Sequence, residues 1–258
     1  MFDKLNIGRT TGGAAVKKST KITIFVLLGI TITAALGFYI WSQQTYKATD
    51  ELHQLVTKND YTEQDGWYEF EQKENAKLGI ILYPGAKVEP IAYGYLAKQL
   101  SLEGYYVAIP KMTLNMAIFD TNIAQEMMDK NPKITQWVIG GHSLGGVTAA
   151  EFAANHPEKI VGLLLLASYP SDNVDFSNGT LQTLSIYADR DRVTPPKDVL
   201  ADQELLSTTA ILHELQGGNH SGFGMYGEQA DDGKATITNL EQQNRIVNQI
   251  AKWLKKFD

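Results

Sequence analysis

The stretch Gly140-Gly141-His142-Ser143-Leu144-Gly145-Gly146 places a serine between two glycines. It follows the apolar run ITQWVI (134–139) and precedes the alanine-rich segment VTAAEFAANH (147–156), so we predict that a buried strand turns sharply into a helix at Ser143. This is the G-x-S-x-G pattern in a strand–turn–helix context, which holds a serine hydroxyl clear of the backbone. Glycine suits so tight a turn because it has no Cβ atom. Ser143 is therefore a candidate nucleophile, and the competing interpretation is a loop in which Ser143 only caps the helix.

On both sides of this stretch, short apolar runs alternate with segments of helical periodicity. The sequence predicts strands at 67–73, 78–84, 105–110, 134–141, 160–168, 181–188 and 208–215, and helices at 91–102, 120–130, 144–155, 196–206 and 238–256. The strand at 67–73 is expected to be the exposed first strand. Such alternation is typical of an α/β fold with a mostly parallel sheet and helices on both faces. The short interval between the strands ending near Ala167 and beginning near Leu181 leaves no room for a large cap domain.

A serine nucleophile needs a base, and the base needs an orienting acid. In a sheet of this type they are expected after later strands, in the order serine, acid, histidine. Asp189 and Asp191 follow the apolar strand of SIYADRDRVTPP, and the pattern small-x-x-Asp-x-Val-x-Pro favours Asp191. His220 follows the last predicted strand in a glycine-rich loop. Ser143, Asp191 and His220 are thus the predicted catalytic residues.

The other histidines and acids fit these roles less well. His53 lies in a polar connector, His142 is the variable position of the elbow, His156 is at a helix exit and His213 is on a strand. Asp231 and Asp232 could form a metal site with His220, but no ligand spacing supports one. We expect neither a metal nor a cofactor.

The developing oxyanion requires backbone N–H donors. One is expected from Leu144, the residue after the serine, and a second from the loop after an early strand. The segment LYPGAKV (82–88) supplies that loop, with Ala86 or Gly85 as the alternative donors. An ordinary Pro-Gly turn is the competing interpretation.

With these partners in place, the chain resembles the α/β-hydrolase superfamily over about residues 67–257, and more narrowly its small, lidless dienelactone-hydrolase-like branch. The motifs that carry the resemblance are YPGAKVEP (83–90), WVIGGHSLGG (137–146), YADRDRVTPP (187–196) and GGNHSGFGMYGEQADDG (217–233). Dienelactone hydrolases use cysteine at the elbow, whereas this chain has Ser143 and no cysteine. An ester is therefore the expected substrate. The PGA of residues 84–86 also replaces the His-Gly dipeptide common in esterases.

The N-terminal part has a different composition. Residues Ile22 to Ile40 contain no charge, which is about the length needed to cross ~30 Å of hydrocarbon as a helix. The preceding residues 1–21 carry five basic side chains and one acidic one, so the positive-inside rule places them in the cytoplasm and the remainder outside. A cleaved signal peptide is the alternative. We predict a basic segment at 1–21, a transmembrane signal anchor at 22–41, a connector at 42–65 with a short helix, and a catalytic domain at 66–258.

Charge narrows the range of partners. The whole chain has a net charge of −6 and residues 1–21 have +4, so the remainder carries −10. An acidic domain is a poor candidate for nucleic-acid binding. The expected partners are a small ester substrate and the membrane, through the N-terminal helix. The residues give no signal for an oligomer.

These observations predict a serine hydrolase of carboxylic esters at the cell membrane. An envelope acyltransferase with the same triad and a non-catalytic surface binding protein that keeps the fold are the alternatives. The apolar side chains in PKMTLNMAIFD (110–120), Met112, Leu114, Met116 and Phe119, could line an acyl site or belong to the core.

Overall fold

The computed structural model describes residues 18–71 and 76–257, which divide into two compact units with a boundary between Trp41 and Ser42. The N-terminal unit holds one helix, α1 (Lys18–Ser42), within which the apolar stretch Thr20–Ser42 has a mean hydropathy of 2.1. The apolar side chains of α1 are exposed all around the helix, an arrangement that water disfavours and hydrocarbon accommodates. The predicted span at 22–41 lies within α1. Its length and composition fit both a membrane anchor and a signal sequence.

The second unit is built on an eight-stranded sheet in the order β1-β2-β4-β3-β5-β6-β7-β8. Strands β3 to β8 run parallel to one another, while β2 pairs antiparallel with both β1 and β4. The mostly parallel α/β fold is therefore confirmed. The strands are β1 (Thr62–Gln64), β2 (Trp67–Phe70), β3 (Leu78–Tyr83), β4 (Tyr106–Pro110), β5 (Gln136–His142), β6 (Ile160–Leu166), β7 (Gln182–Ala188) and β8 (Ile211–Leu215).

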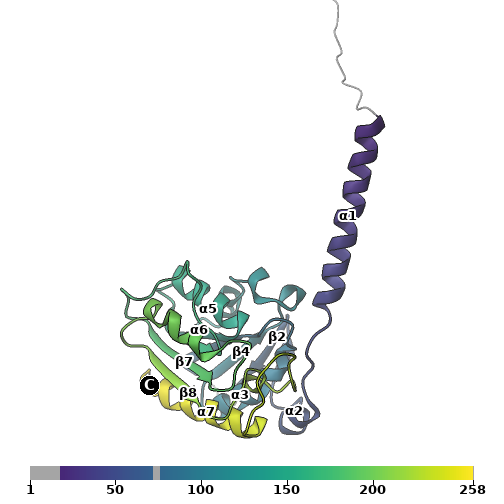
Figure 1. Ribbon diagram of the computed structural model, residues 1–258. Coiled ribbons are helices and arrows are strands. Elements are labelled where there is room, and N and C mark those ends of the chain that lie inside the picture. Colours follow the sequence, from purple (N-terminus) through teal and green to yellow (C-terminus); the bar gives the residue numbers. More distant parts are fainter. Residues whose placement is uncertain (1–17, 72–75, 258) are drawn as a thin grey trace, which may run out of the picture. The chain divides into compact units, whose positions relative to one another are not determined.

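Helices cover both faces of this sheet. One core cluster joins α3 (Gly94–Glu103) and α7 (Asn239–Leu254) to one face, and a second joins α4 (Ala124–Lys130) and α5 (Leu144–Asn155) to the other. In Figure 1, α3 and α7 lie below the sheet, and α5 and α6 (Pro196–Ala201) lie above it. Because strand side chains alternate between faces, Ile80 packs into the first cluster and Ile81 into the second. Residues 167–181, between β6 and β7, contain no helix or strand.

The segment predicted as a connector, 42–65, is packed into the same unit as the sheet. Its short helix α2 (Asp50–Leu55) is capped by the Thr49 hydroxyl, which accepts from Leu52 N–H. Leu52 is fully buried in the first core cluster, which explains why this segment is held in place. The segment also supplies β1, which the sequence did not predict because the strand is three exposed residues long.

The prediction of an exposed first strand at 67–73 is wrong. This strand, β2, lies between β1 and β4, and Trp67, Tyr68 and Phe70 are buried. Its rough alternation of polar and apolar residues suggested a solvated face, but its two faces pack into different core clusters. The end of the predicted strand, 72–73, lies outside the described residues. The short 3₁₀ helices Pro90–Tyr93, Thr113–Asn115, Ala117–Phe119, Asp202–Leu205 and Ser221–Phe223 complete the unit.

Candidate active site

Ser143 occupies the turn between β5 and α5 in a strained backbone conformation. Its φ of 53° and ψ of −125° are unfavourable for a residue with a Cβ atom and persist only where surrounding packing enforces them. A Cβ atom on Gly145 would lie 2.2 Å from the Tyr83 carbonyl oxygen, and one on Gly141 would lie 2.5 Å from the Gly145 carbonyl carbon. Glycine at both positions therefore lets the start of α5 pack directly against the ends of β3 and β5.

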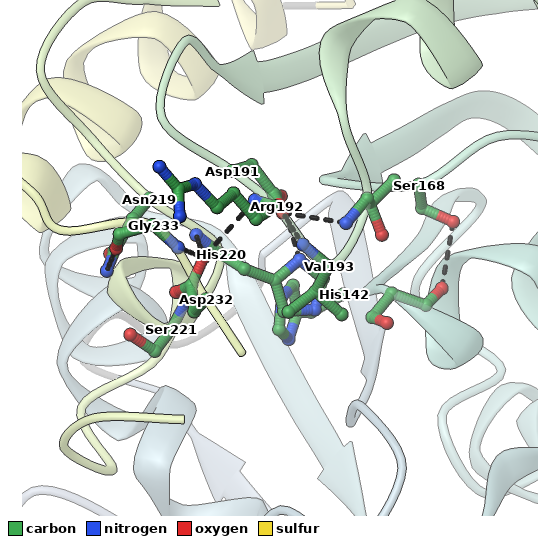
Figure 2. Close-up of polar contacts among 12 residues, drawn as sticks. His142, Ser168, Asp191, Arg192, Val193, Asn219, His220, Ser221, Asp232 and Gly233 are labelled. Atoms are coloured by element: carbon green, nitrogen blue, oxygen red, sulfur yellow. Dashed lines mark hydrogen bonds and ion pairs between the residues drawn. The ribbon is translucent and has the colours of Figure 1, made fainter. Parts of the chain in front are cut away.

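Hydrogen bonds from β6 and the loop after it fix this turn. Ser143 N–H donates to the Leu166 carbonyl at 3.0 Å, and the Ser168 hydroxyl donates to the Ser143 carbonyl at 2.8 Å. Ser168 is buried, and Figure 2 shows it beside the elbow. Ser168 was not predicted, because no local pattern marks a serine that supports a residue 25 positions away. Ser143 is half-buried, and its backbone is held on both sides.

Asp191 and His220 form a buried pair in the loops after β7 and β8. His220 Nδ1 lies 2.8 Å from Asp191 Oδ2, while Asp191 Oδ1 accepts from the backbone N–H groups of Val193 at 2.9 Å and Thr194 at 2.7 Å. Figure 2 shows Asp191 between His220 and Val193. The carboxylate is thus fully hydrogen-bonded, which buried ions require. The alternative acid, Asp189, is exposed and instead accepts from Gly217 N–H at 2.6 Å.

Asp232 organises the loop that carries His220. Its carboxylate accepts from the backbone N–H groups of Ser221 at 2.9 Å, Gly233 at 2.7 Å and His220 at 3.3 Å. Figure 2 shows Asp232 beneath His220, with Gly233 and Asn219 alongside. From the sequence, Asp232 is a candidate only for metal binding. In the structure it orders the turn, while the neighbouring Asp231 is exposed.

His142, the variable residue of the elbow, forms a second buried histidine site. The Tyr93 hydroxyl lies 2.9 Å from His142 Nδ1 and accepts from Gly85 N–H at 3.0 Å. Burial raises the pKa of Tyr93, so its hydroxyl keeps its proton and can donate it to Nδ1. Burial, and secondarily the neighbouring His220, holds the pKa of His142 well below its usual range. His142 is therefore neutral, and no local pattern identifies Tyr93 as its partner.

This network distinguishes the two alternative oxyanion donors. Gly85 N–H is already used by Tyr93. The N–H groups of Ala86 and of Leu144, the first residue of α5, make no hydrogen bond within residues 18–71 and 76–257. A helix N-terminus favours negative charge near its free N–H groups. Leu144 and Ala86 are accordingly the pair available to an oxyanion.

Ser143 and His220 are brought to the same edge of the sheet, although no hydrogen bond joins them in the described part of the chain. The contact between their two loops is made by His142, whose ring centroid lies 4.4 Å from that of His220. Hydrogen bonds of catalytic groups are often long without substrate and shorten when it binds. The arrangement can therefore supply a nucleophile, a base with a buried acid partner, and free N–H donors.

The apolar segment 110–120 divides between core and surface. Met112 packs in the second core cluster and Met116 is buried, which favours the core interpretation for both. Phe119 is exposed and Leu114 half-buried. Only these two remain candidates for contact with a substrate.

A family model described as the alpha/beta hydrolase family matches residues 79–244, well over half of the chain. The chain belongs to the α/β hydrolase family. The matched region contains Ser143, Asp191 and His220 and supports hydrolase chemistry for this α/β hydrolase. No curated protein matches it in sequence.

Solved structures with the same fold include hydrolases from several sources. A metagenomic α/β hydrolase from lagoon sediment has a TM-score of 0.58 at 17% identity, with 77% of this chain and 99% of that chain covered. A predicted CIB-like hydrolase from Thermoplasma acidophilum has a TM-score of 0.56 at 14% identity, with coverages of 74% and 96%. A thermophilic esterase from Thermogutta terrifontis has a TM-score of 0.55 at 13% identity, with coverages of 76% and 97%. At these identities the likeness extends to the fold alone.

Proposed function

We propose that this α/β hydrolase is a serine hydrolase that cleaves carboxylic esters through an acyl-enzyme. The observation that carries the proposal is the buried Asp191–His220 pair, 2.8 Å apart, on the sheet edge where the strained elbow presents Ser143. Serine in place of cysteine at the elbow favours an ester over the dienelactone implied by the resemblance to the dienelactone-hydrolase-like branch. The esterase among the structural neighbours is consistent with this chemistry.

In the first half-reaction, His220 Nε2 takes the proton from Ser143 Oγ as the oxygen attacks the ester carbonyl. Asp191 holds Nδ1–H and stabilises the imidazolium. The N–H groups of Leu144 and Ala86 donate to the tetrahedral oxyanion, and His220 then gives its proton to the departing alkoxide. In the second half-reaction, water loses a proton to His220 and attacks the acyl-enzyme. The tetrahedral intermediate then expels Ser143 Oγ, which takes the proton back from His220, and the carboxylic acid leaves.

The proposal includes an uncleaved N-terminal anchor with the hydrolase unit outside the cell. The apolar stretch of α1 and the basic residues before it support this orientation. Mass measurement of the protein recovered from both the membrane and the soluble fraction tests whether the anchor is uncleaved, because retention of residues 1–41 is expected for an anchor and their loss for a cleaved signal peptide.

Substitution of the proposed nucleophile tests the chemistry. In Ser143→Ala, turnover of p-nitrophenyl esters should fall by about 10³-fold or more, and labelling by a fluorophosphonate probe should disappear. Ser177→Ala is the matched control, because the Ser177 hydroxyl accepts from its neighbour Asn178, and it should keep both activities. Undiminished turnover by Ser143→Ala, with a normal unfolding transition, would refute the assignment.

A further inference from the structure

The carboxyl ends of the parallel strands, with the loops that carry Ala86, Ser143, Asp191 and His220, are here called the catalytic edge. The segment that follows the hydrophobic helix is hydrogen-bonded to this edge. Tyr46 N–H donates to the Lys87 carbonyl at 2.7 Å, and Glu89 N–H donates to the Tyr46 carbonyl at 2.9 Å. Ala48 N–H donates to the Glu89 carboxylate at 2.9 Å. These bonds form a short parallel bridge between Tyr46 and Val88. Residues 42–49, here called the post-helix segment, therefore pair with the loop after β3.

The same segment contacts two more loops at this edge. The Asn115 side chain, in the loop after β4, donates to the Ser42 carbonyl at 3.0 Å. Thr49 N–H donates to the Met225 carbonyl at 2.9 Å, and the Tyr46 ring lies 5.6 Å from that of Tyr226, both in the loop that carries His220. All three contacted loops follow the carboxyl ends of parallel strands. They include the loops of Ala86 and His220.

Chain length then limits how far this edge can lie from the end of the hydrophobic helix. Ser42 directly follows Trp41, and the four residue steps from Ser42 to Tyr46 span at most ~14 Å. A domain tethered by a long, free linker could turn any face toward the bilayer. Here the segment that would act as a linker is itself bonded to the loops around the site.

Exposed apolar side chains lie on the same edge. Ile118 and Phe119, in the loop after β4, are 51% and 47% exposed, and Val193, two residues after Asp191, is 38% exposed. An aqueous surface gains nothing from these side chains, whereas a lipid interface accommodates them. These side chains favour contact between this edge and lipid. That preference agrees with the short length of chain between this edge and the hydrophobic helix.

We infer that the catalytic edge faces the outer surface of the membrane and that the substrate is an amphiphilic ester carried in that membrane. This inference rests on the proposed ester hydrolysis and on the uncleaved anchor. Ser143 would meet acyl esters of lipids or of lipid-linked molecules that lie in the bilayer. A dissolved ester would have to enter between this edge and the membrane.

The placement can be tested without reference to activity. The chain contains no cysteine, so Ile118→Cys and Glu158→Cys each create a unique labelling site in the full-length protein. Glu158 is exposed just before β6, at the opposite edge of the sheet. In proteoliposomes of phosphatidylcholine and phosphatidylglycerol containing a spin-labelled lipid, a bimane label at position 118 should be quenched at least twofold more than one at 158. Equal quenching, or stronger quenching at 158, would overturn the inference.

The substrate class is tested by separating the edge from the membrane. A flexible insertion of 20 Gly/Ser residues between Trp41 and Ser42 has an r.m.s. reach of about 25 Å. It should lower the turnover of a long-chain methylumbelliferyl ester embedded in the vesicles by about fivefold or more, because the effective concentration falls with linker length. Turnover of a water-soluble short-chain methylumbelliferyl ester should stay within about twofold. The same insertion between Gly12 and Gly13, before the helix, is the matched control and should change neither rate.

Two other outcomes can be told apart. Unchanged turnover of the embedded ester by the 41/42 insertion variant would overturn the membrane-borne substrate and leave ester hydrolysis standing. Failure of the wild-type protein to cleave either ester would overturn the proposed hydrolysis and the substrate with it, while the quenching ratio would still decide which edge faces the bilayer.

Discussion

The two regions that meet at the candidate site each contribute a buried histidine, and the two histidines differ in their partners. His220, on the loop after β8, is paired through Nδ1 with the carboxylate of Asp191. His142, in the elbow, is paired through Nδ1 with the hydroxyl of Tyr93, which has no negative charge to offer a protonated ring. The rings lie only 4.4 Å apart between centroids, so location alone does not distinguish them.

The difference shows how a partner at Nδ1 sets the role of an imidazole. A carboxylate stabilises the imidazolium that forms when a histidine accepts a proton, which is what a general base requires. A neutral phenol in a buried site leaves the protonated ring without compensation, so His142 stays neutral and serves as a hydrogen-bonding element. We expect substitutions on the His220 side to act mainly on turnover, and those on the His142 side mainly on stability.

Replacing each histidine in turn with an amide side chain should produce the largest difference in kcat between the two sides. His220→Gln should lower kcat for a p-nitrophenyl ester by about 10⁴-fold or more, because the base is lost. His142→Asn should lower it by about tenfold at most, since an amide can still bond the Tyr93 hydroxyl. Steady-state kinetics on both variants measure the contrast, and comparable losses would contradict the division of roles.

Substitution of Asp191, the acid bonded to His220, should have the next largest effect on kcat. Asp191→Asn removes the charge that fixes the tautomer, and kcat should fall by about 10²- to 10⁴-fold with little change in KM. Asp189→Asn is the matched control, because the Asp189 carboxylate accepts from Gly217 N–H and not from His220, and the variant should stay within about threefold of wild type. A larger loss for Asp189→Asn than for Asp191→Asn would reverse the assignment of the acid.

On the elbow side, Tyr93→Phe should destabilise the protein by about 1–3 kcal/mol. The change leaves Gly85 N–H and His142 Nδ1 without a partner inside the protein. Tyr95→Phe is a control two residues away, because the Tyr95 hydroxyl bonds Asn244 at an exposed site, and it should cost no more than about 0.5 kcal/mol. Urea unfolding of both variants in detergent micelles gives the two values. Equal losses of unfolding free energy in the two variants would contradict a stabilising role for the Tyr93 hydrogen bonds.

The smallest expected effect is on how the free energy of unfolding depends on pH in the wild-type protein and in His142→Asn. His142 has its pKa lowered in the folded state, so the unfolded chain binds a proton near pH 6.5 that the folded chain does not. Stability contributed by this site is therefore complete above about pH 7 and is lost as the pH falls through the unfolded value. Between pH 7.5 and 5.5 the wild-type protein should lose about 1.4 kcal/mol more unfolding free energy than His142→Asn. An identical loss in both proteins would mean that His142 is not buried in neutral form.

Much of the fold could be predicted because its signals are local. Continuous apolar runs such as LGIILY identify strands buried on both faces, and the glycines around Ser143 identify a turn that only small residues permit. The position of Asp191 at the end of β7 follows from the same local pattern. The prediction for β2 was wrong because its rough alternation indicates a solvated face, whereas its two faces pack into different core clusters.

The sequence by itself determined the α/β architecture, the elbow, the order of serine, acid and histidine, and the hydrophobic helix, since each depends on residue types within a short window. Only the tertiary structure decided that Tyr93 bonds His142, that Asp232 orders the loop of His220, and that the post-helix segment contacts the loops after β3, β4 and β8. These contacts join polar groups far apart in the chain, and loop paths rather than local periodicity bring them together.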